Sequence, residues 1–254
     1  MTNPLISKLE NFAKLSADEK QALQRLVSAR PLKTRAHEDI IREGEDPKSI
    51  TVVLQGWACR YKQLEDGRRQ IVSFFLPGDV CDTNVFILRE MDHSISALTN
   101  VTFAQISSAS FEELVASYPR LSYGMWWETL VNMAVQREWT VNLGQRSAFE
   151  RLAHLFCELF LRLRAVGMAQ PNSFILPIRQ HDIADATGLS SVHVNRTLQE
   201  LRALKLIVLK GKVLTIPDLD ALMQAAMFNP NYLHLDNEGR NLDSNERDQP
   251  ETAG

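Results

Sequence analysis

The chain of 254 residues is poor in cysteine, and its cysteines follow no ligand or disulfide pattern. Cys59, Cys81 and Cys157 are odd in number, far apart and without CxxC spacing, which argues against a disulfide framework and a cysteine zinc site. No stretch reaches about 18 uninterrupted apolar residues, and the first residues lack the features of a signal peptide. We therefore expect a soluble, cytoplasmic protein with reduced thiols and no membrane partner.

The motifs of the common catalytic classes are missing as well. The sequence contains no GxSxG, no glycine-rich phosphate loop followed by lysine and no HExxH. Its six histidines are scattered, and none pairs with a cysteine or serine in a recognisable motif. We predict that the protein is not an enzyme and has neither a catalytic residue nor a metal site.

A strong positive charge is also absent from the chain as a whole, whose formal net charge is -3. The sign nevertheless changes along the sequence. From Arg146 to Lys212 there are ten Lys or Arg against five Asp or Glu, whereas residues 213–254 hold two against eight. A local basic excess of this kind is typical of a domain that neutralises DNA phosphates.

The amino-terminal part contains short β-rich runs separated by glycines. Gly44, Gly56, Gly67 and Gly78 recur every 11 or 12 residues. Turn signals at this spacing predict an all-β roll or barrel. The runs 93–98 and 101–106 extend the pattern, and helices are expected near residues 17–28 and 111–117.

A long helix is expected from Pro119 to about Asn142, with Gly144 where it can stop. Its apolar positions are more numerous than one face of a β-roll needs. Part of them, including Trp126 or Trp127, therefore either pack against a second copy or are buried within one subunit. The positions that recur at intervals of three and four are Tyr123, Trp127, Leu130, Ala134, Arg137 and Val141, with Met133 beside them.

A further helix is expected over residues 148–166. Its apolar stripe consists of Leu152, Leu155, Phe156, Leu159 and Leu163.

Residues 179–203 read RQHDIADATGLSSVHVNRTLQELRA, which contains two short helical patterns around Gly188. Glycine suits the left-handed conformation that such a turn requires. Ile183 and Ala184 are expected to face inward. The second helix begins near Ser191, and the spacing of Val194, Leu198 and Leu201 predicts its buried stripe.

The outer side of this second helix carries groups that can read DNA. Val192, Arg196 and Gln199 lie there, with His193 and Asn195 on the flanks. Arg can donate to guanine, Asn and Gln can pair with adenine, and Val can contact a thymine methyl. The other candidate DNA-binding residues around the helix pair are Ser191, Arg179 and Gln180. A helical hairpin whose polar face meets only water is the alternative.

The following run, residues 206–216, predicts a hairpin around Lys210, Gly211 and Lys212. Helix, turn, helix and hairpin together predict a winged helix-turn-helix. The two lysines at the tip of the wing are candidate phosphate contacts.

The order of these parts, with IREGED, DGRRQIVSFFLPGDV and HDIADATGLSSVHVNRTLQELR, resembles the bacterial Crp/Fnr superfamily of transcription regulators. The resemblance covers nearly everything from residue 10 to residue 220. It implies an α+β fold with an amino-terminal β-roll like a cyclic-nucleotide-binding jelly roll, a long dimerisation helix and a carboxyl-terminal winged helix-turn-helix. The implied division is a sensor at 1–118, a dimerisation helix at 119–143, a DNA-binding domain at 144–220, and an extension with a disordered acidic tail at 221–254.

The resemblance also implies partners. They are a second copy of the chain, palindromic double-stranded DNA, RNA polymerase and an unknown small-molecule or redox signal.

The sensor departs from the pattern of the cyclic-nucleotide binders. Alignment on the family motif places Thr83 where those proteins carry Glu and His93 where they carry Arg, while Ser94 is retained. Asp82 and Asp92 would repel a phosphate. These departures argue against a cyclic nucleotide, and the absence of an amino-terminal cysteine group argues against an iron–sulfur cluster.

The effector is therefore left open. The candidate effector pocket consists of Cys81, Asp82, Thr83, His93 and Ser94. One alternative is a redox-, gas- or metal-responsive regulator that uses Cys81 and His93, with His37 as a further ligand. Another is a β-roll adaptor that does not bind DNA.

The reading helix departs from the family pattern too. Arg196 matches the family's guanine-reading Arg, but Val192 replaces an acidic residue of the best-known branches. The expected operator therefore differs from the two familiar consensus sequences.

Overall fold

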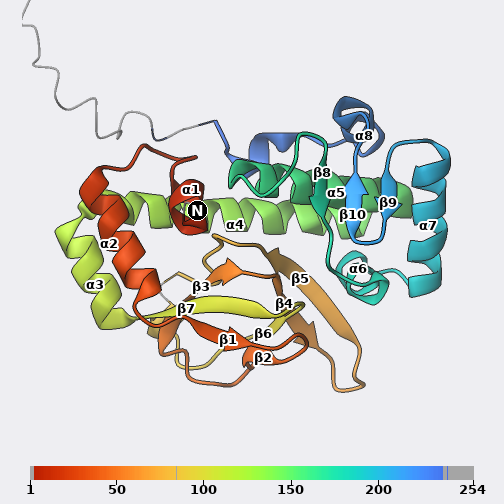
Figure 1. The fold of residues 1–254 in the computed structure, drawn as a ribbon. Coiled ribbons are helices and arrows are strands. Elements are labelled where there is room, and N and C mark those ends of the chain that lie inside the picture. Colours follow the sequence, from red (N-terminus) through yellow and green to blue (C-terminus); the bar gives the residue numbers. More distant parts are fainter. Residues whose placement is uncertain (1–2, 84, 237–238, 240–254) are drawn as a thin grey trace, which may run out of the picture.

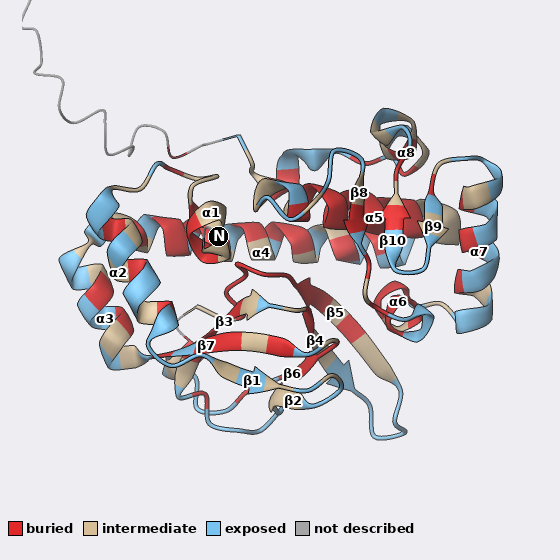
Figure 2. Cartoon of the chain, in the orientation of Figure 1, coloured by how far each residue is buried: buried red, intermediate tan, exposed pale blue. Residues whose placement is uncertain are grey.

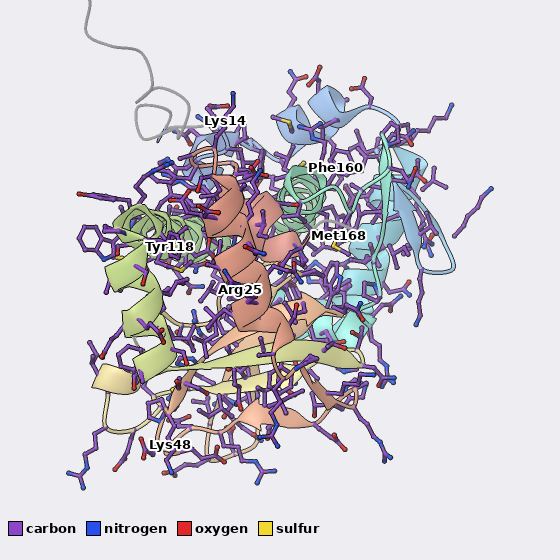
Figure 3. All side chains as sticks on the ribbon, turned by 60° about the vertical axis from the view of Figure 1, so that its left-hand side comes forward. Lys14, Arg25, Lys48, Tyr118, Phe160 and Met168 are labelled. Atoms are coloured by element: carbon purple, nitrogen blue, oxygen red, sulfur yellow. The ribbon has the colours of Figure 1, made fainter. Side chains whose placement is uncertain are left out.

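The structure is a computed structural model, and it describes residues 3–83, 85–236 and 239. The helix α4 (Pro119–Gln145) crosses the molecule, with a β-roll on one side of it and a helical head at one end (Figure 1). No helix in the described ranges is long and apolar enough to span a membrane. Figure 3 shows the end of the molecule opposite the head, with Arg25 on α2 and Tyr118 where α3 gives way to α4.

The β-roll consists of two antiparallel sheets in the strand orders β1-β7-β3 and β2-β6-β4-β5. Side chains such as Val53, Phe75 and Phe103 fill the space between the sheets. The strands are β1 (Leu32–Thr34), β2 (Asp39–Ile41), β3 (Ser49–Gln55), β4 (Ala58–Gln63), β5 (Arg69–Phe75), β6 (Ser94–Ala97) and β7 (Val101–Ser107). The flanking helices are α1 (Pro4–Leu9), α2 (Ala17–Ser28), the short 3-10 helix η1 (Val85–Ile87) and α3 (Ser108–Ser117).

The predicted all-β sensor is confirmed, and so is the helix at Ala17–Ser28, which begins with a capping box of Ser16 and Glu19. The other predicted helix of this region begins three residues earlier than expected, at Ser108. The elements α1, β1 and β2 were not predicted, because they are short and lack a clear period.

The long helix continues through Gly144 to Gln145, so the expected stop at the glycine is wrong. A glycine inside a helix costs only about 1 kcal/mol relative to alanine. Arg146 Nη1 also donates to Asn142 Oδ1 at 2.9 Å, one turn back. The helix ends where Ser147 caps the next one.

The predicted apolar stripe of α4 straddles the border between a buried and an exposed face (Figure 2). Trp127 and Ala134 are buried, together with Val131, whereas Tyr123 and Leu130 are exposed. The centre of the buried face therefore lies to one side of the predicted stripe. Trp126 is 59% exposed, so Trp127 is the tryptophan that packs within the subunit.

The head begins with α5 (Ala148–Ala165), whose predicted apolar stripe is buried as expected. Residues beyond 220 belong to the same hydrophobic core, because Leu222, Phe228, Tyr232 and Leu233 are buried in it. The other elements are β8 (Ser173–Ile175), α6 (Gln180–Thr187), α7 (Ser191–Ala203), β9 (Val208–Lys210), β10 (Val213–Thr215), α8 (Leu219–Ala225) and the 3-10 helix η2 (Pro230–Leu233). Apart from Asp236 and Gly239, the expected acidic tail lies outside the described residues.

A buried ionic network joins the head to the β-roll. Arg162 of α5 donates Nη2 to Phe74 O at 2.9 Å and to Asp79 Oδ2 at 2.7 Å, in the turn after β5. Lys8 of α1 contacts Asp79 from another side. Burial tends to raise the pKa of Asp79, but the Lys8 and Arg162 cations outweigh it and hold that pKa below its usual value. The carboxylate therefore stays charged and tied to α5.

Candidate nucleic-acid interface

The turn between α6 and α7 follows local rules of helix termination and capping. Gly188 ends α6 with φ 65°, in the left-handed region. Ser190 then caps α7, since its side chain accepts the backbone N–H of His193 at 3.2 Å. The predicted helix-turn-helix is confirmed at both positions.

The buried side of α7 holds the reading pair together and leaves its other side free. Val194, Leu198 and Leu201 are buried against α5, as predicted. Val192 is 81% exposed at the start of the helix. The candidate residues Ser191, Asn195, Arg196 and Gln199 are also exposed, and His193 is half-buried.

Residues from α6 extend this surface. Asn195 Nδ2 lies 3.4 Å from Gln180 Oε1, so these two side chains join the two helices. Arg179 and Gln180 are both exposed at the amino-terminal end of α6. Apart from the half-buried His193, all the candidates that the sequence analysis placed on the helix pair are thus exposed.

The wing is a hairpin of β9 and β10, with Lys210 and Lys212 exposed on either side of Gly211. The glycine has φ 58°, as the tight turn requires. A third strand, β8, pairs with β10 and was missing from the sequence prediction. It anchors the wing on the head, because Leu176 N–H also donates to Lys212 O at 2.7 Å.

Part of the basic excess of this region is structural. Arg162 is bound in the buried ionic network, and Arg146 pairs with Glu138 at 2.7 Å. Arg151 donates to the backbone carbonyls of Thr187 and Arg146. The charge available to DNA therefore comes from fewer residues than the regional count suggests, chiefly those of α7, the wing and the start of α6.

Family models match two parts of the chain. A cyclic nucleotide-binding domain matches residues 31–118, and a Crp-like helix-turn-helix domain matches residues 150–225. The nitrogen fixation regulation protein FixK of Bradyrhizobium diazoefficiens is 34% identical over 164 residues, which are 65% of this chain and 68% of that protein. The chain belongs to the Crp/Fnr family of transcriptional regulators.

Other relatives agree with this assignment. The transcriptional activator protein FnrL of Cereibacter sphaeroides is 28% identical over 185 residues, 70% of this chain and 72% of that protein. The solved structure of FixK2 from Bradyrhizobium japonicum has a TM-score of 0.68 at 25% identity and covers 77% of this chain and 96% of that one. The protein is thus a regulator with a DNA-binding helix-turn-helix and not an enzyme, as predicted from the sequence.

The candidate effector residues of this Crp/Fnr regulator gather around Arg60 of β4. Arg60 Nη2 donates to Cys81 O at 2.5 Å and to Asp82 Oδ1 at 2.6 Å, and its Nε lies 3.1 Å from His93 Nε2. His93 Nδ1 pairs with Asp92 Oδ1 at 2.6 Å, and this hydrogen bond lowers the pKa of Asp92. Arg60 was not singled out in the sequence analysis, because its burial and its partners are visible only in the structure.

The other two pocket candidates serve neighbouring elements. Thr83 Oγ1 lies 2.6 Å from Thr129 Oγ1 and so links the loop after β5 to α4. Ser94 Oγ accepts the backbone N–H of Glu43 at 3.0 Å.

These contacts do not fit a cyclic nucleotide, although residues 31–118 match a cyclic nucleotide-binding domain. An anionic phosphate needs an available cation, and the Arg60 guanidinium is already paired with the Asp82 carboxylate. A second carboxylate, Asp92, flanks His93. Asp82 and Asp92 thus already place negative charge beside Arg60 and His93, where a phosphate would need a free cation.

The metal and redox alternatives gain no support from this geometry. Within the described ranges, no three His, Cys, Asp or Glu side chains are grouped as metal ligands. His37 faces α6 instead, with its ring centroid 6.4 Å from that of His181. Burial and the neighbouring Asp82 raise the pKa of Cys81 well above its ordinary value, so its side chain is a protonated thiol.

Proposed function

We propose that this Crp/Fnr regulator binds palindromic operators as a homodimer and inserts the exposed face of α7 into the major groove. The observation that carries the proposal is the solvent-exposed outer side of α7, on which Val192, Asn195, Arg196 and Gln199 are all exposed. A helix has the width to enter the major groove of B-DNA, and its neighbours then contact the backbone.

Each residue receives a role from its chemistry. Arg196 donates two hydrogen bonds to guanine, Asn195 and Gln199 pair with adenine, and Val192 contacts a thymine methyl. Ser191 and His193 serve bases or phosphates at the start of α7. Arg179, Gln180, Lys210 and Lys212 hold the backbone on either side.

The second face of α4 supports the homodimer. Tyr123, Trp126, Leu130 and Met133 are exposed at spacings of three, four and three, the pattern of a seam between two helices. Exposed apolar residues in a continuous row favour association. Two copies joined along α4 would present two heads to the two halves of a palindrome.

We propose the division into a sensor at 1–118, a dimerisation helix at 119–143, a DNA-binding domain at 144–220 and an extension at 221–254, the first part of which packs into the core of the head. RNA polymerase is the further proposed partner, and the relatives named transcriptional activators support a role in the regulation of transcription. The paired Arg60 and Asp82 favour a signal other than a cyclic nucleotide.

Binding selection on random duplex DNA, followed by gel shifts at two salt concentrations, tests this function. We expect a two-fold consensus whose half-sites lack the cytosine read by an acidic residue at the position of Val192. Affinity should fall steeply with salt, because phosphate contacts release counterions. Failure to bind DNA with and without cell extract would favour the adaptor alternative.

A further inference from the structure

The first helix of the reading pair, α6, rests on the β-roll through a contact that DNA binding does not use. Arg69, the first residue of β5, places Nε 2.9 Å from Asp185 Oδ2 and Nη2 3.1 Å from Asp182 Oδ1. The next residue, Gln70, donates Nε2 to Ala186 O at 3.3 Å. In Figure 1, α6 lies beside the end of β5, and α7 stands on the outer edge of the head.

Asp182 connects this contact to the first turn of α6. Its side chain is 1% exposed, and its Oδ2 accepts the backbone N–H of Arg179 at 2.9 Å, which fixes the first turn of the helix. A buried carboxylate without a partner is costly, so Arg69 supplies the charge that Asp182 needs. Burial tends to lower the pKa of Arg69, but the hydrogen bond to Asp185 and the charges of Asp185 and Asp182 outweigh it and raise that pKa.

This docking leaves the DNA surface free. Arg179 and Gln180 are exposed although the cap of their helix is bound to β5. The lysines of the wing and the outer residues of α7 are exposed as well. Docking on the sensor and contact with DNA therefore occupy different sides of the head.

We propose that Arg69 is a positioning residue for DNA binding, which holds α6, and with it α7, in one orientation on the sensor sheet. The inference rests on the proposed function. A head fixed in its binding orientation needs no search for the second half-site, whereas a loose head binds with an affinity reduced by the fraction of time it spends correctly placed.

Operator affinity of full-length variants tests the proposal. Arg69→Gln is expected to weaken operator binding about tenfold, chiefly through faster dissociation. Arg68→Gln is the matched control, because it removes the same charge one residue away, and Arg68 pairs with Asp66 at an exposed position. Arg69→Lys should recover part of the loss. Equal affinities of Arg69→Gln and Arg68→Gln, or tighter binding by Arg69→Gln, would overturn the proposal.

A double variant separates positioning from simple neutralisation of Asp182. Asp182→Asn keeps an oxygen that caps α6 but removes the buried charge. We therefore expect Arg69→Gln with Asp182→Asn to fold and still bind weakly. Recovery of the wild-type affinity would show that Arg69 only neutralises a carboxylate, and the positioning role would be refuted.

Spin labels measure the orientation of the head without DNA. Glu65 and Ala203 are exposed, on the hairpin between β4 and β5 and at the end of α7, and all three native cysteines are buried. Labels on Glu65→Cys and Ala203→Cys, diluted with unlabelled protein, should give a narrow distance distribution that broadens with Arg69→Gln and not with Arg68→Gln. A narrow distribution in all variants would refute the docking role. If the wild type binds no DNA, the proposed function fails while this measurement still decides whether Arg69 holds the head.

Discussion

The Arg60 guanidinium and the Asp82 carboxylate lie 2.6 Å apart in the β-roll. Only 16% and 23% of the two side chains are exposed, so the pair is shielded from solvent more than an ordinary surface salt bridge. The cation that lies nearest to the expected effector residues is therefore already neutralised.

Because of this pairing, cyclic AMP should not bind. Titration calorimetry with millimolar cyclic AMP is expected to give no saturable heat, and the melting temperature should not move. A saturable heat with one site per chain would contradict the expectation. Asp82→Ala, which frees Arg60, provides the comparison for an anion site made available.

Loss of Arg196 should relax one base position of the operator. Arg196→Ala is expected to cost about 1 to 3 kcal/mol, the usual value of a bidentate contact with guanine. Gel shifts on the selected operator and on variants of each base pair measure both effects. Arg25→Ala, an exposed arginine on α2 labelled in Figure 3, is the control. An equal loss on all sequences would make Arg196 a phosphate contact instead.

A charge in the exposed row of α4 should separate the two copies. Leu130→Glu brings two like charges together across a two-fold seam, at a cost of about 3 kcal/mol or more. Sedimentation velocity should then show monomers at concentrations where the wild type is dimeric. Leu64→Glu, at a leucine of similar exposure on the β4–β5 hairpin, should leave the dimer intact. Identical sedimentation of both variants would argue against this seam.

Stability should fall in mild acid because of His154. Burial, helped by the Arg146 cation, lowers its pKa to about 3. The unfolded chain binds a proton near pH 6.5 that the folded protein refuses, so the free energy of unfolding falls as pH decreases between those values. The slope from this one group is about 1.4 kcal/mol per pH unit well below pH 6.5. Urea unfolding of His154→Gln at pH 6.5 and 5 should show a shallower fall, and parallel profiles would contradict the assignment.

The cysteines should be unreactive in the folded protein. Burial raises the pKa of Cys59 and Cys157 to about 12, and that of Cys81 is raised well above its ordinary value. A thiol reagent at pH 8 is expected to label all three only after denaturation. Rapid labelling of Cys81 in the native state would restore the redox-sensor alternative.

The helix-turn-helix could be predicted because its turn and its caps depend on residues that are close in the sequence. Gly188 and Ser190 act on their immediate neighbours, and the stripe of Val194, Leu198 and Leu201 repeats within one helix. The buried face of α4 was harder to predict. A stripe of period 3.6 shows where apolar side chains gather on a helix, but it does not show which side of that stripe meets the β-roll. Trp126 and Trp127 could not be told apart for this reason.

Contacts between distant segments were out of reach. Arg60 of β4 and Asp82 of the loop after β5 are brought together by the fold of the β-roll, and Arg69 and Asp182 by the docking of two domains. Neither pair has a spacing that marks it in the chain. The third strand of the wing, β8, escaped for the same reason, because it is short and pairs with a strand 38 residues further on.

The contact between Arg162 and Asp79 ties the head to a turn of the β-roll close to the candidate effector residues. Asp79 precedes Cys81 by two residues, and Arg162 stands fifteen residues into the helix that begins after Ser147. That separation is about 22 Å along the axis of α5. A displacement of Asp79 would therefore shift α5 at a point far from Ser147. Since α7 is packed on α5, the reading face would travel with it. The two sheets of the β-roll need not change for this, because Asp79 lies in the turn after β5 and not in a strand.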